Sequence, residues 1–337
     1  MKVAAKVLPI MFLTLAIAEF RGMAHAAEKV IIAHRGASGY VPEHTLEGVA
    51  MSHAFGVNYI EQDLVLTKDR VPVVLHDIEL EPMTDVAIKF PGRCRADGKY
   101  YAIDFTLAEI KQLNLHERKN LKTGEQAFPG RFPMMLGQFR IPTLEEELQL
   151  IQGLNKSRGK NIGIYPEIKS PSFHRAEGAD LSAIAIKILA QYGYKSKSDN
   201  CIMQCFEWPE LKEIRKLGYS GRLVYLVGGK TTRLDGEEKV PFNLETMKQI
   251  AKVADGVGPA YSLVIDEDTA GNWKRTGFVS LAHQAGLVVH PYTIRADVPM
   301  GKVKDISQMF ELIFTEGQAD GVFTDHPDAG VRWRQSH

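Results

Sequence analysis

Residues 30–55, VIIAHRGASGYVPEHTLEGVAMSHAF, join a short run rich in β-branched residues to a stretch of helical periodicity through a glycine-containing loop. This is the pattern of one β-strand followed by one α-helix, and the chain repeats it. Strands that alternate with helices form parallel sheets, and we count eight such units. We therefore predict an α/β fold, a closed TIM-type (β/α)8 barrel, with an open doubly wound sheet as the alternative.

The other units follow from the same alternation of apolar and polar residues. We predict strands at residues 30–34, 58–63, 162–168, 201–206, 222–227, 254–258, 287–294 and 320–324. Helical patterns lie between most of them, at residues 45–55, 143–153, 180–192, 208–217, 243–253, 276–285 and 306–316. Active sites of such barrels lie at the carboxyl ends of the strands, so the residues that end each strand are the candidates for chemistry.

The beginning of the chain has the pattern of an export signal. Lys2 and Lys6 precede an apolar run over residues 7–18, and small residues follow within residues 24–26 (AHA). We therefore predict a cleaved signal peptide at residues 1–26 and no stable membrane anchor after cleavage. An uncleaved anchor or a buried helix is the alternative.

The composition and the cysteines exclude several other classes of protein. The chain is 45% hydrophobic, with 41 basic and 41 acidic side chains, which excludes intrinsic disorder and nucleic-acid binding by charge alone. The three cysteines are Cys94, Cys201 and Cys205. The last two are four residues apart in a predicted strand, roughly 13 Å, which is too far for a disulfide between them.

A hairpin interrupts the alternation after the second predicted strand. Two extended runs flank residues 68–71 (KDRV), and so short a connection permits only antiparallel pairing. With Asp69 and Arg70 as a two-residue turn, Asp63 would lie opposite His76. The hairpin would then return His76 to the barrel mouth.

A long segment follows this hairpin, at about residues 79–141. It exceeds the usual length of a connection inside one barrel unit. It also contains its own helix start, a capping-box pattern at residues 106–109 (TLAE). We predict a small inserted subdomain after the second strand, within a barrel domain that spans residues 27–337.

Three acidic residues near the strand ends indicate a metal site. Glu61 and Asp63 are two residues apart on one strand, so their carboxylates share a face, and Glu167 adds a third from another strand. Such a cluster is unfavourable unless a cation compensates its charge, and carboxylates without thiols suit Ca²⁺ or Mg²⁺. Pairing of these acids with Arg35 and Lys169 is the alternative.

Two histidines, His34 and His76, end neighbouring segments beside these acids. Histidine titrates near neutral pH, so one can act as general base and the other as general acid. Arg35 and Lys169 supply positive charge for a phosphate group. Two aromatic side chains at strand ends are candidates for the pocket wall, with a place in the core as the alternative: Phe206 and Tyr292.

Six motifs in this order resemble those of the glycerophosphodiester phosphodiesterase family, and in their detailed wording those of its periplasmic bacterial type. They are residues 34–40 (HRGASGY), 42–45 (PEHT), 61–63 (EQD), 73–77 (VVLHD), 166–169 (PEIK) and 320–325 (DGVFTD). Many members of the family have asparagine where this chain has His44, which we expect to order the first loop.

The resemblance implies hydrolysis of glycerophosphodiesters, such as glycerophosphocholine or glycerophosphoethanolamine, to glycerol 3-phosphate and an alcohol. It assigns metal binding to Glu61, Asp63 and Glu167, acid–base catalysis to the two histidines, and phosphate binding to Arg35 and Lys169. It further implies one divalent cation, Ca²⁺ with Mg²⁺ as the alternative, and a periplasmic location. A homodimer is left open. An enzyme acting on intact phospholipids and a non-catalytic phosphodiester-binding protein are the alternative functions.

Overall fold

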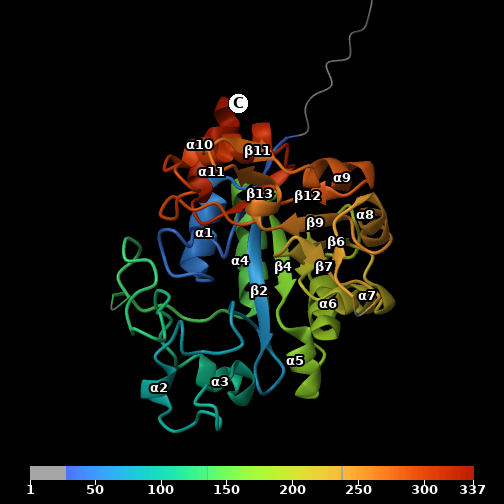
Figure 1. Ribbon diagram of the computed structural model, residues 1–337. Coiled ribbons are helices and arrows are strands. Elements are labelled where there is room, and N and C mark those ends of the chain that lie inside the picture. The colour runs from blue at the N-terminus through green and yellow to red at the C-terminus, as the bar shows by residue number, and fades with distance from the viewer. Residues whose placement is uncertain (1–27, 135, 237) are drawn as a thin grey trace, which may run out of the picture.

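Eight parallel strands form the centre of the molecule (Figure 1), in a computed structural model that describes residues 28–134, 136–236 and 238–337. The strand order around the sheet is β12-β9-β6-β5-β4-β2-β1-β13. The bounds are β1 Val30–Ala33, β2 Tyr59–Leu66, β4 Gly163–Ile168, β5 Ile202–Cys205, β6 Arg222–Val227, β9 Gly256–Pro259, β12 Val288–Val289 and β13 Gly321–Thr324. The predicted signal peptide at residues 1–26 lies outside the described residues.

The sheet closes on itself between the segment after β12 and strand β13. Ile294 and Thr324 form a parallel bridge. The amide of Ile294 donates to the carbonyl of Phe323 at 2.9 Å, and the amide of Asp325 donates to the carbonyl of Ile294 at 3.1 Å. The predicted TIM-type barrel is therefore confirmed over an open sheet, although its last closure consists of one isolated bridge and the hydrogen bonds beside it.

Strand β12 is much shorter than the predicted strand at residues 287–294. Regular pairing ends after Val289, and Pro291 follows. Proline has no N–H to donate to a neighbouring strand, so the ladder is interrupted there.

Helices cover the outside of the barrel (Figure 1). They are α1 Leu46–Phe55, α4 Leu144–Arg158, α5 Pro171–Ala176, α6 Leu181–Gln191, α7 Trp208–Lys216, α8 Leu244–Ala251, α9 Phe278–Gln284, α10 Ile306–Glu311 and α11 Pro327–Ser336. Short elements complete the barrel region: β7 Thr231–Thr232, β8 Val240–Pro241, η2 Tyr261–Leu263, β10 Ile265–Glu267, β11 Trp273–Arg275 and η3 Leu312–Glu316. No helix among the described residues is long and apolar enough to span a bilayer.

Alternate residues of each barrel strand point inward and outward, as the two-residue period of a strand requires. On β1, Ile31 belongs to the apolar cluster between sheet and helices, whereas Ile32 belongs to a separate cluster inside the barrel. Tyr59 and Tyr165 also lie in the inner cluster. The inner cluster fills the lower part of the barrel. The next inward-facing residues along the strands therefore form the floor of its mouth.

The segment between the β2–β3 hairpin and α4 lies beyond the carboxyl end of β2 (Figure 1). With β3 (Pro72–Val74) before it, the segment contains α2 Val86–Lys89, η1 Ala102–Asp104 and α3 Leu107–Ile110. Thr106 caps α3 in the predicted capping box. An apolar cluster of its own, which includes Leu80, Met83 and Phe105, packs against the hairpin.

The predicted register of the β2–β3 hairpin is wrong by one residue. Leu64 pairs with Val74, and Asp63 accepts a hydrogen bond from the amide of Leu75, so His76 lies one position beyond. The cause is the turn: Arg70 adopts a left-handed conformation with φ 62°. This residue lengthens the connection from two residues to three.

Candidate active site

All nine side chains that the sequence predicts for the site line one pocket of about 200 Å³ at the carboxyl ends of the barrel strands. They are His34, Arg35, Glu61, Asp63, His76, Glu167, Lys169, Phe206 and Tyr292. Five of them lie two or four residues along the chain from members of the inner apolar cluster: His34, Glu61, Asp63, Glu167 and Phe206. The strand period thus aims them into the mouth.

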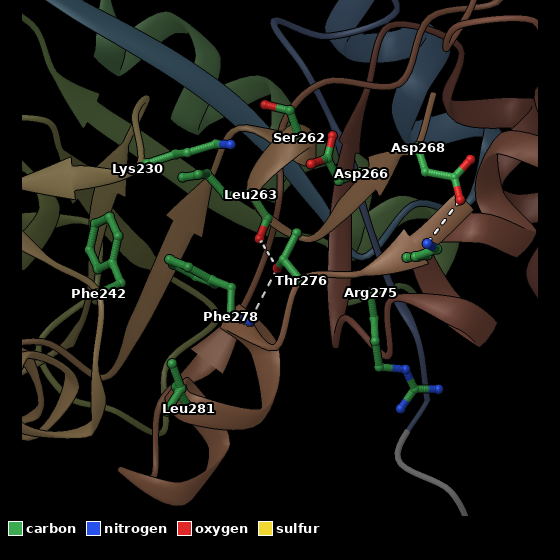
Figure 2. A pocket seen from close by; sticks show the side chains of 11 residues that line it. Lys230, Phe242, Ser262, Leu263, Asp266, Asp268, Arg275, Thr276, Phe278 and Leu281 are labelled. Atoms are coloured by element: carbon green, nitrogen blue, oxygen red, sulfur yellow. Dashed lines mark hydrogen bonds and ion pairs between the residues drawn. The ribbon is translucent and has the colours of Figure 1, made fainter. Parts of the chain in front are cut away.

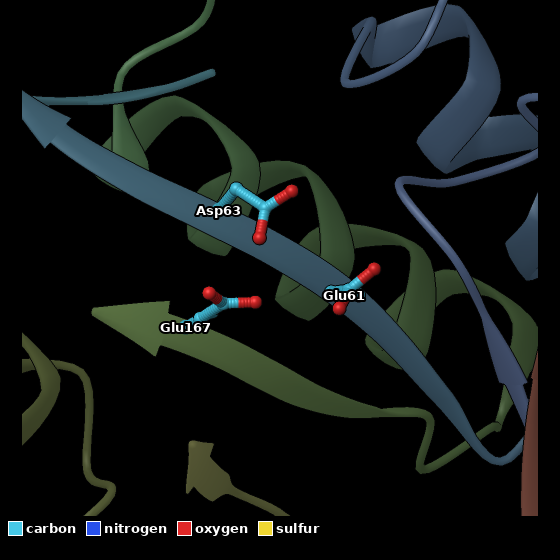
Figure 3. A group of neighbouring side chains, drawn as sticks. All are labelled: Glu61, Asp63 and Glu167. Atoms are coloured by element: carbon cyan, nitrogen blue, oxygen red, sulfur yellow. The ribbon is translucent and has the colours of Figure 1, made fainter. Parts of the chain in front are cut away.

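The three carboxylates of Glu61, Asp63 and Glu167 point toward one another (Figure 3), and all three residues line this pocket. One oxygen from each lies within 4.8 Å of the others, and all three residues are buried. Strands β2 and β4 pair directly, with Asp63 beside Glu167, which explains the convergence. An all-oxygen, all-carboxylate donor set fits a hard divalent cation.

Two basic side chains offset part of this negative charge. Lys169 Nζ lies 2.7 Å from Glu167, and Arg35 Nε lies 3.4 Å from Asp63. The alternative pairing is therefore also present, but it accounts for only two of the three acids. Glu61 instead accepts hydrogen bonds from the amide of Arg35 at 3.0 Å and from Gln204 at 2.8 Å.

The pKa values reflect this incomplete compensation. Burial raises the pKa of Glu61 well above its usual range, and the charges of Asp63 and Glu167 raise it further. Burial also raises the pKa of Glu167 to about 7, although Lys169 opposes the effect. At Asp63, burial acts in the same direction, but Lys169 and His44 hold its pKa well below the usual range. A bound cation would favour the ionised form of all three acids.

His34 is fixed by a carboxylate behind it. Its Nδ1 lies 2.5 Å from Asp325 Oδ1, while its Nε2 lies 3.8 Å from Glu61. An ionised carboxylate only accepts hydrogen bonds, so Nδ1 carries the proton and Nε2 offers a lone pair to the pocket. Burial, followed by the charge of Arg35, lowers the pKa of His34 to about 3, which keeps the ring neutral.

His76 has the same arrangement on a more exposed side of the pocket. Its Nδ1 lies 2.7 Å from Asp77 Oδ1. Burial, followed by the charge of Arg35, lowers the pKa of His76 to about 4. Burial acts to raise the pKa of Asp77, but its bond with His76 and the charge of Arg118 lower it to about 2.

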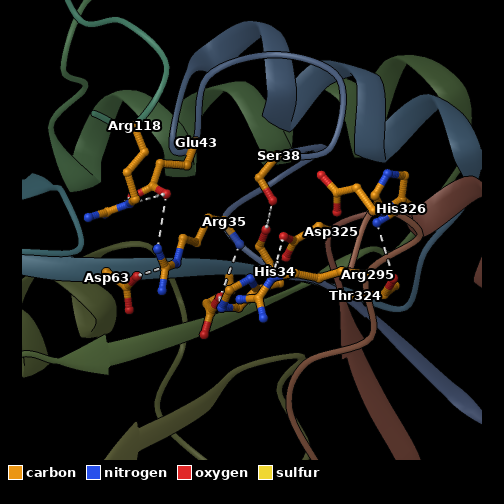
Figure 4. A network of polar contacts seen from close by, with 12 residues as sticks. His34, Arg35, Ser38, Glu43, Asp63, Arg118, Arg295, Thr324, Asp325 and His326 are labelled. Carbon is orange, nitrogen blue, oxygen red and sulfur yellow. Dashed lines mark hydrogen bonds and ion pairs between the residues drawn. The ribbon is translucent and has the colours of Figure 1, made fainter. Parts of the chain in front are cut away.

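The loop after β1 positions Arg35 between two acids (Figure 4). Arg35 has φ 58°, and its Nη1 donates to Glu43 at 3.0 Å while its Nε faces Asp63. His44, also at positive φ, lies with its Nε2 2.8 Å from Asp63 Oδ2. Residues of both loop motifs, 34–40 and 42–45, therefore contact the same carboxylate, that of Asp63.

Comparison with known proteins agrees with this geometry. Residues 34–329 match the model of the glycerophosphoryl diester phosphodiesterase family. The chain is 44% identical to a glycerophosphodiester phosphodiesterase of Haemophilus influenzae (91% of this chain, 90% of the relative) and 38% identical to one of Treponema pallidum (91% and 92%). The chain belongs to the glycerophosphoryl diester phosphodiesterase family. It is a phosphoric diester hydrolase.

Solved structures share the fold of this phosphodiesterase. One from Silicibacter pomeroyi, provisionally assigned as a glycerophosphoryl diester phosphodiesterase, is 25% identical with a TM-score of 0.69 and covers 93% of this chain and 95% of its own. A phosphodiesterase of Oleispira antarctica, solved in complex with its product sn-glycerol-3-phosphate, is 21% identical with a TM-score of 0.62, and the match covers 92% and 98%.

Sequence reasoning assigned no role to several residues that hold the phosphodiesterase site in place. They are Glu43, Asp77, Arg118, Arg131, Arg295 and Asp325. Asp77 follows His76 directly, and Asp325 follows the last strand, so their positions gave a usable signal. Arg118 and Arg131 lie in the long connecting segment without any motif around them.

A larger hollow, of about 450 Å³, lies beside β10 and β11 (Figure 2). Asp266 and Asp268 line it, and Asp268 is paired with Lys274 at 2.9 Å. Its described lining residues include no histidine. It therefore lacks the acid–base groups of the smaller pocket, and size does not identify the active site of this phosphodiesterase.

The aromatic residues Phe206 and Tyr292 form one wall of the smaller pocket. Their ring centroids lie 5.8 Å apart at 77°, an edge-on contact. Phe206 is 43% exposed, whereas the Tyr292 hydroxyl donates to the carbonyl of Val227 at 3.2 Å. Both side chains thus reach the pocket rather than lying wholly in the core.

Proposed function

We propose that the enzyme hydrolyses glycerophosphodiesters, such as glycerophosphocholine and glycerophosphoethanolamine, to glycerol 3-phosphate and an alcohol. One observation carries this proposal. Two histidines, each with a carboxylate on Nδ1, border the same buried cluster of three acids. A site with an acid, a base and a cation-binding centre is what phosphodiester cleavage requires.

The side chains of the site have different roles, which follow from their charges and from the histidine tautomers. Glu61, Asp63 and Glu167 would hold one divalent cation, which would polarise the phosphate and neutralise its developing charge. Arg35 and Lys169 border the same space and would bind the non-bridging phosphate oxygens. The substrate phosphate would then lie between the two histidines.

We assign His34 as the base and His76 as the acid. His34 offers its Nε2 lone pair to the pocket, so it can take the proton of the attacking hydroxyl group, from water or from the neighbouring glycerol hydroxyl. His76 would act in its protonated form, which the charges of Asp77 and of the bound phosphate favour, and would give its Nε2 proton to the alcohol oxygen as the ester bond breaks. If the glycerol hydroxyl attacks, a cyclic phosphodiester forms first, and water opens it to glycerol 3-phosphate in a second step.

Ca²⁺ is the cation that we propose, with Mg²⁺ as the alternative. The oxygen-only donor set supports a hard cation. The choice of Ca²⁺ rests on the resemblance to the exported bacterial enzymes. Titration calorimetry of the chelator-treated protein with each cation tests it, and Glu61→Gln should weaken binding by at least about tenfold. Unchanged Ca²⁺ affinity in that variant would contradict the ligand assignment.

The activity is tested by incubating the protein with glycerophosphocholine and measuring glycerol 3-phosphate, with Ca²⁺, Mg²⁺ or a chelator present. We expect product with a cation and none with the chelator. Substrate that binds without reacting would indicate a phosphodiester-binding protein. Turnover of phospholipid vesicles in preference to glycerophosphocholine would indicate an enzyme that acts on intact lipids.

We also propose that the enzyme is exported to the periplasm after cleavage of residues 1–26. The support is the basic, apolar and small-residue order of that segment. Mass spectrometry of the protein from a periplasmic extract should find a mature chain that begins at Ala27. A full-length chain retained in the cytoplasmic fraction would contradict this proposal.

A further inference from the structure

The two histidine–carboxylate pairs share a feature outside the barrel. In each pair, the carboxylate oxygen that does not face the histidine is bound by an arginine. Arg118 Nη1 donates to Asp77 Oδ2 at 2.7 Å, and Arg131 Nη2 donates to Asp325 Oδ2 at 2.7 Å. Both arginines come from one short stretch, residues 118–131, of the segment that follows the hairpin.

Arg118 is itself held from the far side. Its Nη2 and Nε donate to the two oxygens of Glu43, at 2.6 and 3.3 Å. Figure 4 shows Glu43 between Arg118 and Arg35. The guanidinium is planar, so a fork that is fixed on Glu43 can present Nη1 to Asp77 in only one direction. Arg118 therefore determines where Asp77, and through it His76, can lie.

Arg131 is held even more firmly. Its Nε and Nη2 donate to both oxygens of Asp297 at 2.7 and 3.0 Å, and its Nη1 donates to the carbonyl of Ser38 at 3.2 Å. Its guanidinium lies 3.8 Å from the centre of the Phe128 ring, and its side chain is only 4% exposed. A buried group with this many partners is a rigid support for Asp325.

We propose that residues 118–131 are a positioning element for catalysis, which fixes His76 through Arg118 and Asp77 and fixes His34 through Arg131 and Asp325. The inference rests on the proposed roles of the two histidines. Neither arginine lines the pocket, so neither is placed to touch the substrate. They act through the carboxylates, which hold each ring in the productive tautomer and orientation.

The expected effect is therefore on turnover and not on substrate binding. We expect Arg118→Gln to lower kcat about 10–100-fold with KM changed less than about twofold, in the range seen when outer-shell partners are removed. Arg131→Gln should lower kcat less, about tenfold, because Arg295 Nε also donates to Asp325 Oδ2 at 2.7 Å and remains.

Arg95→Gln is the matched control. Arg95 lies in the same long segment and makes a similar two-point contact with Asp104, at 2.7 and 2.8 Å. Its carboxylate partners, Asp104 and Glu177, form no hydrogen bond or ion pair with a histidine among the described residues. Its kcat should equal that of the unmodified enzyme. Circular dichroism melts of all variants report folding. If Arg131→Gln does not fold, Arg131→Lys takes its place, because lysine keeps the charge but loses the fork.

A substrate with an acidic leaving group distinguishes the role of Arg118, which acts through His76, from that of Arg131, which acts through His34. The p-nitrophenyl ester of glycerol 3-phosphate can replace glycerophosphocholine as the substrate. Its leaving group needs no proton, so the kcat of Arg118→Gln should then approach that of the Arg95→Gln control. The loss in Arg131→Gln should persist, because the base is still needed. Arg118→Lys should recover part of the activity on glycerophosphocholine.

Four results would count against these claims. If His34→Ala and His76→Ala are inactive while the folded arginine variants match Arg95→Gln, the positioning role is wrong and the proposed function stands. If the histidine variants retain full activity, the acid–base roles of the histidines are wrong and the positioning role fails with them; if the unmodified enzyme releases no glycerol 3-phosphate, the proposed function itself is wrong. Arginine variants that raise KM without lowering kcat would also overturn the positioning role, since they would indicate direct substrate contact.

Discussion

On one side of the pocket, His34 has a side chain that is 9% exposed, and its partner Asp325 is 2% exposed. On the other side, His76 is 29% exposed and Asp77 is 22% exposed. Two arginines, Arg131 and Arg295, bind Asp325, whereas Arg118 is the one arginine among the described residues that binds Asp77. The same series of contacts, from histidine to carboxylate to arginine, is thus buried on one side of the pocket and partly exposed on the other.

The difference follows the two tasks that we assign to the histidines. A base that acts on a hydroxyl group beside the cation site works on one fixed geometry, which a closed and rigid support provides. An acid that protonates the departing alcohol must let alcohols of different size leave, which requires an opening. The comparison therefore predicts that loss of the carboxylate costs more on the His34 side than on the His76 side, whereas loss of one arginine costs less there, because Asp325 keeps a second arginine.

The largest effects should come from the histidines themselves. We expect His34→Ala and His76→Ala each to reduce turnover of glycerophosphocholine by roughly 10²–10⁴-fold, the usual range for general acid–base catalysis. With the p-nitrophenyl ester, His76→Ala should recover to within about tenfold of the unmodified enzyme, whereas His34→Ala should not. Steady-state kinetics on both substrates measure this. Recovery in His34→Ala instead would reverse the two assignments.

The carboxylates should show a smaller effect with the same asymmetry. Asp325→Asn should lower kcat by roughly 10²-fold, and Asp77→Asn by about tenfold, because a neutral amide holds the ring less strongly. Asp325→Asn also removes the buried charge that Arg131 and Arg295 share, although Arg131 keeps its contacts with Asp297, and we expect a cost of about 3 kcal/mol of unfolding free energy. At the more exposed Asp77 we expect about 1 kcal/mol. Urea unfolding followed by fluorescence gives both values, and equal losses would contradict the comparison.

The smallest effect on turnover concerns Glu117, beside Arg118, where we expect a change in stability alone. Burial raises its pKa from 4.5 to about 7, and its Oε2 has no hydrogen-bond partner in the described part of the chain. Between these pH values the unfolded chain releases a proton that the folded protein keeps, so stability falls as pH rises. Glu117→Gln should remove this dependence and add about 1–3 kcal/mol at pH 8, with little change at pH 4.5. Urea unfolding at both pH values tests this, and an equal gain at both would contradict it.

Much of the site could be predicted because it depends on local periodicity. Once residues 59–66 form a strand, Glu61 and Asp63 must share a face with Tyr59, and the barrel makes that face the interior. The strand pairing that brings Glu167 beside Asp63 follows from the order of the strands. The hairpin register was predicted wrongly because the three-residue turn depends on a left-handed conformation at Arg70, and arginine is not a residue type that usually indicates such a turn.

The supports of the two histidines could not be predicted in the same way. Asp325 is 291 residues from His34, and Arg131 is 194 residues from Asp325. No periodicity relates such positions. Arg118 and Arg131 resemble the other arginines of their segment, and only the path of the chain over the barrel mouth distinguishes them from Arg95.

By itself, the sequence determined the barrel, the inward direction of the three acids and His34, and the chemistry that they suit. These follow from the geometry of a single strand or helix, which nearby residues dictate. Only the tertiary structure decided which carboxylate stands behind each histidine and which arginine holds it. Those contacts depend on where a long irregular segment crosses the folded barrel, and that path is set by packing of the whole molecule.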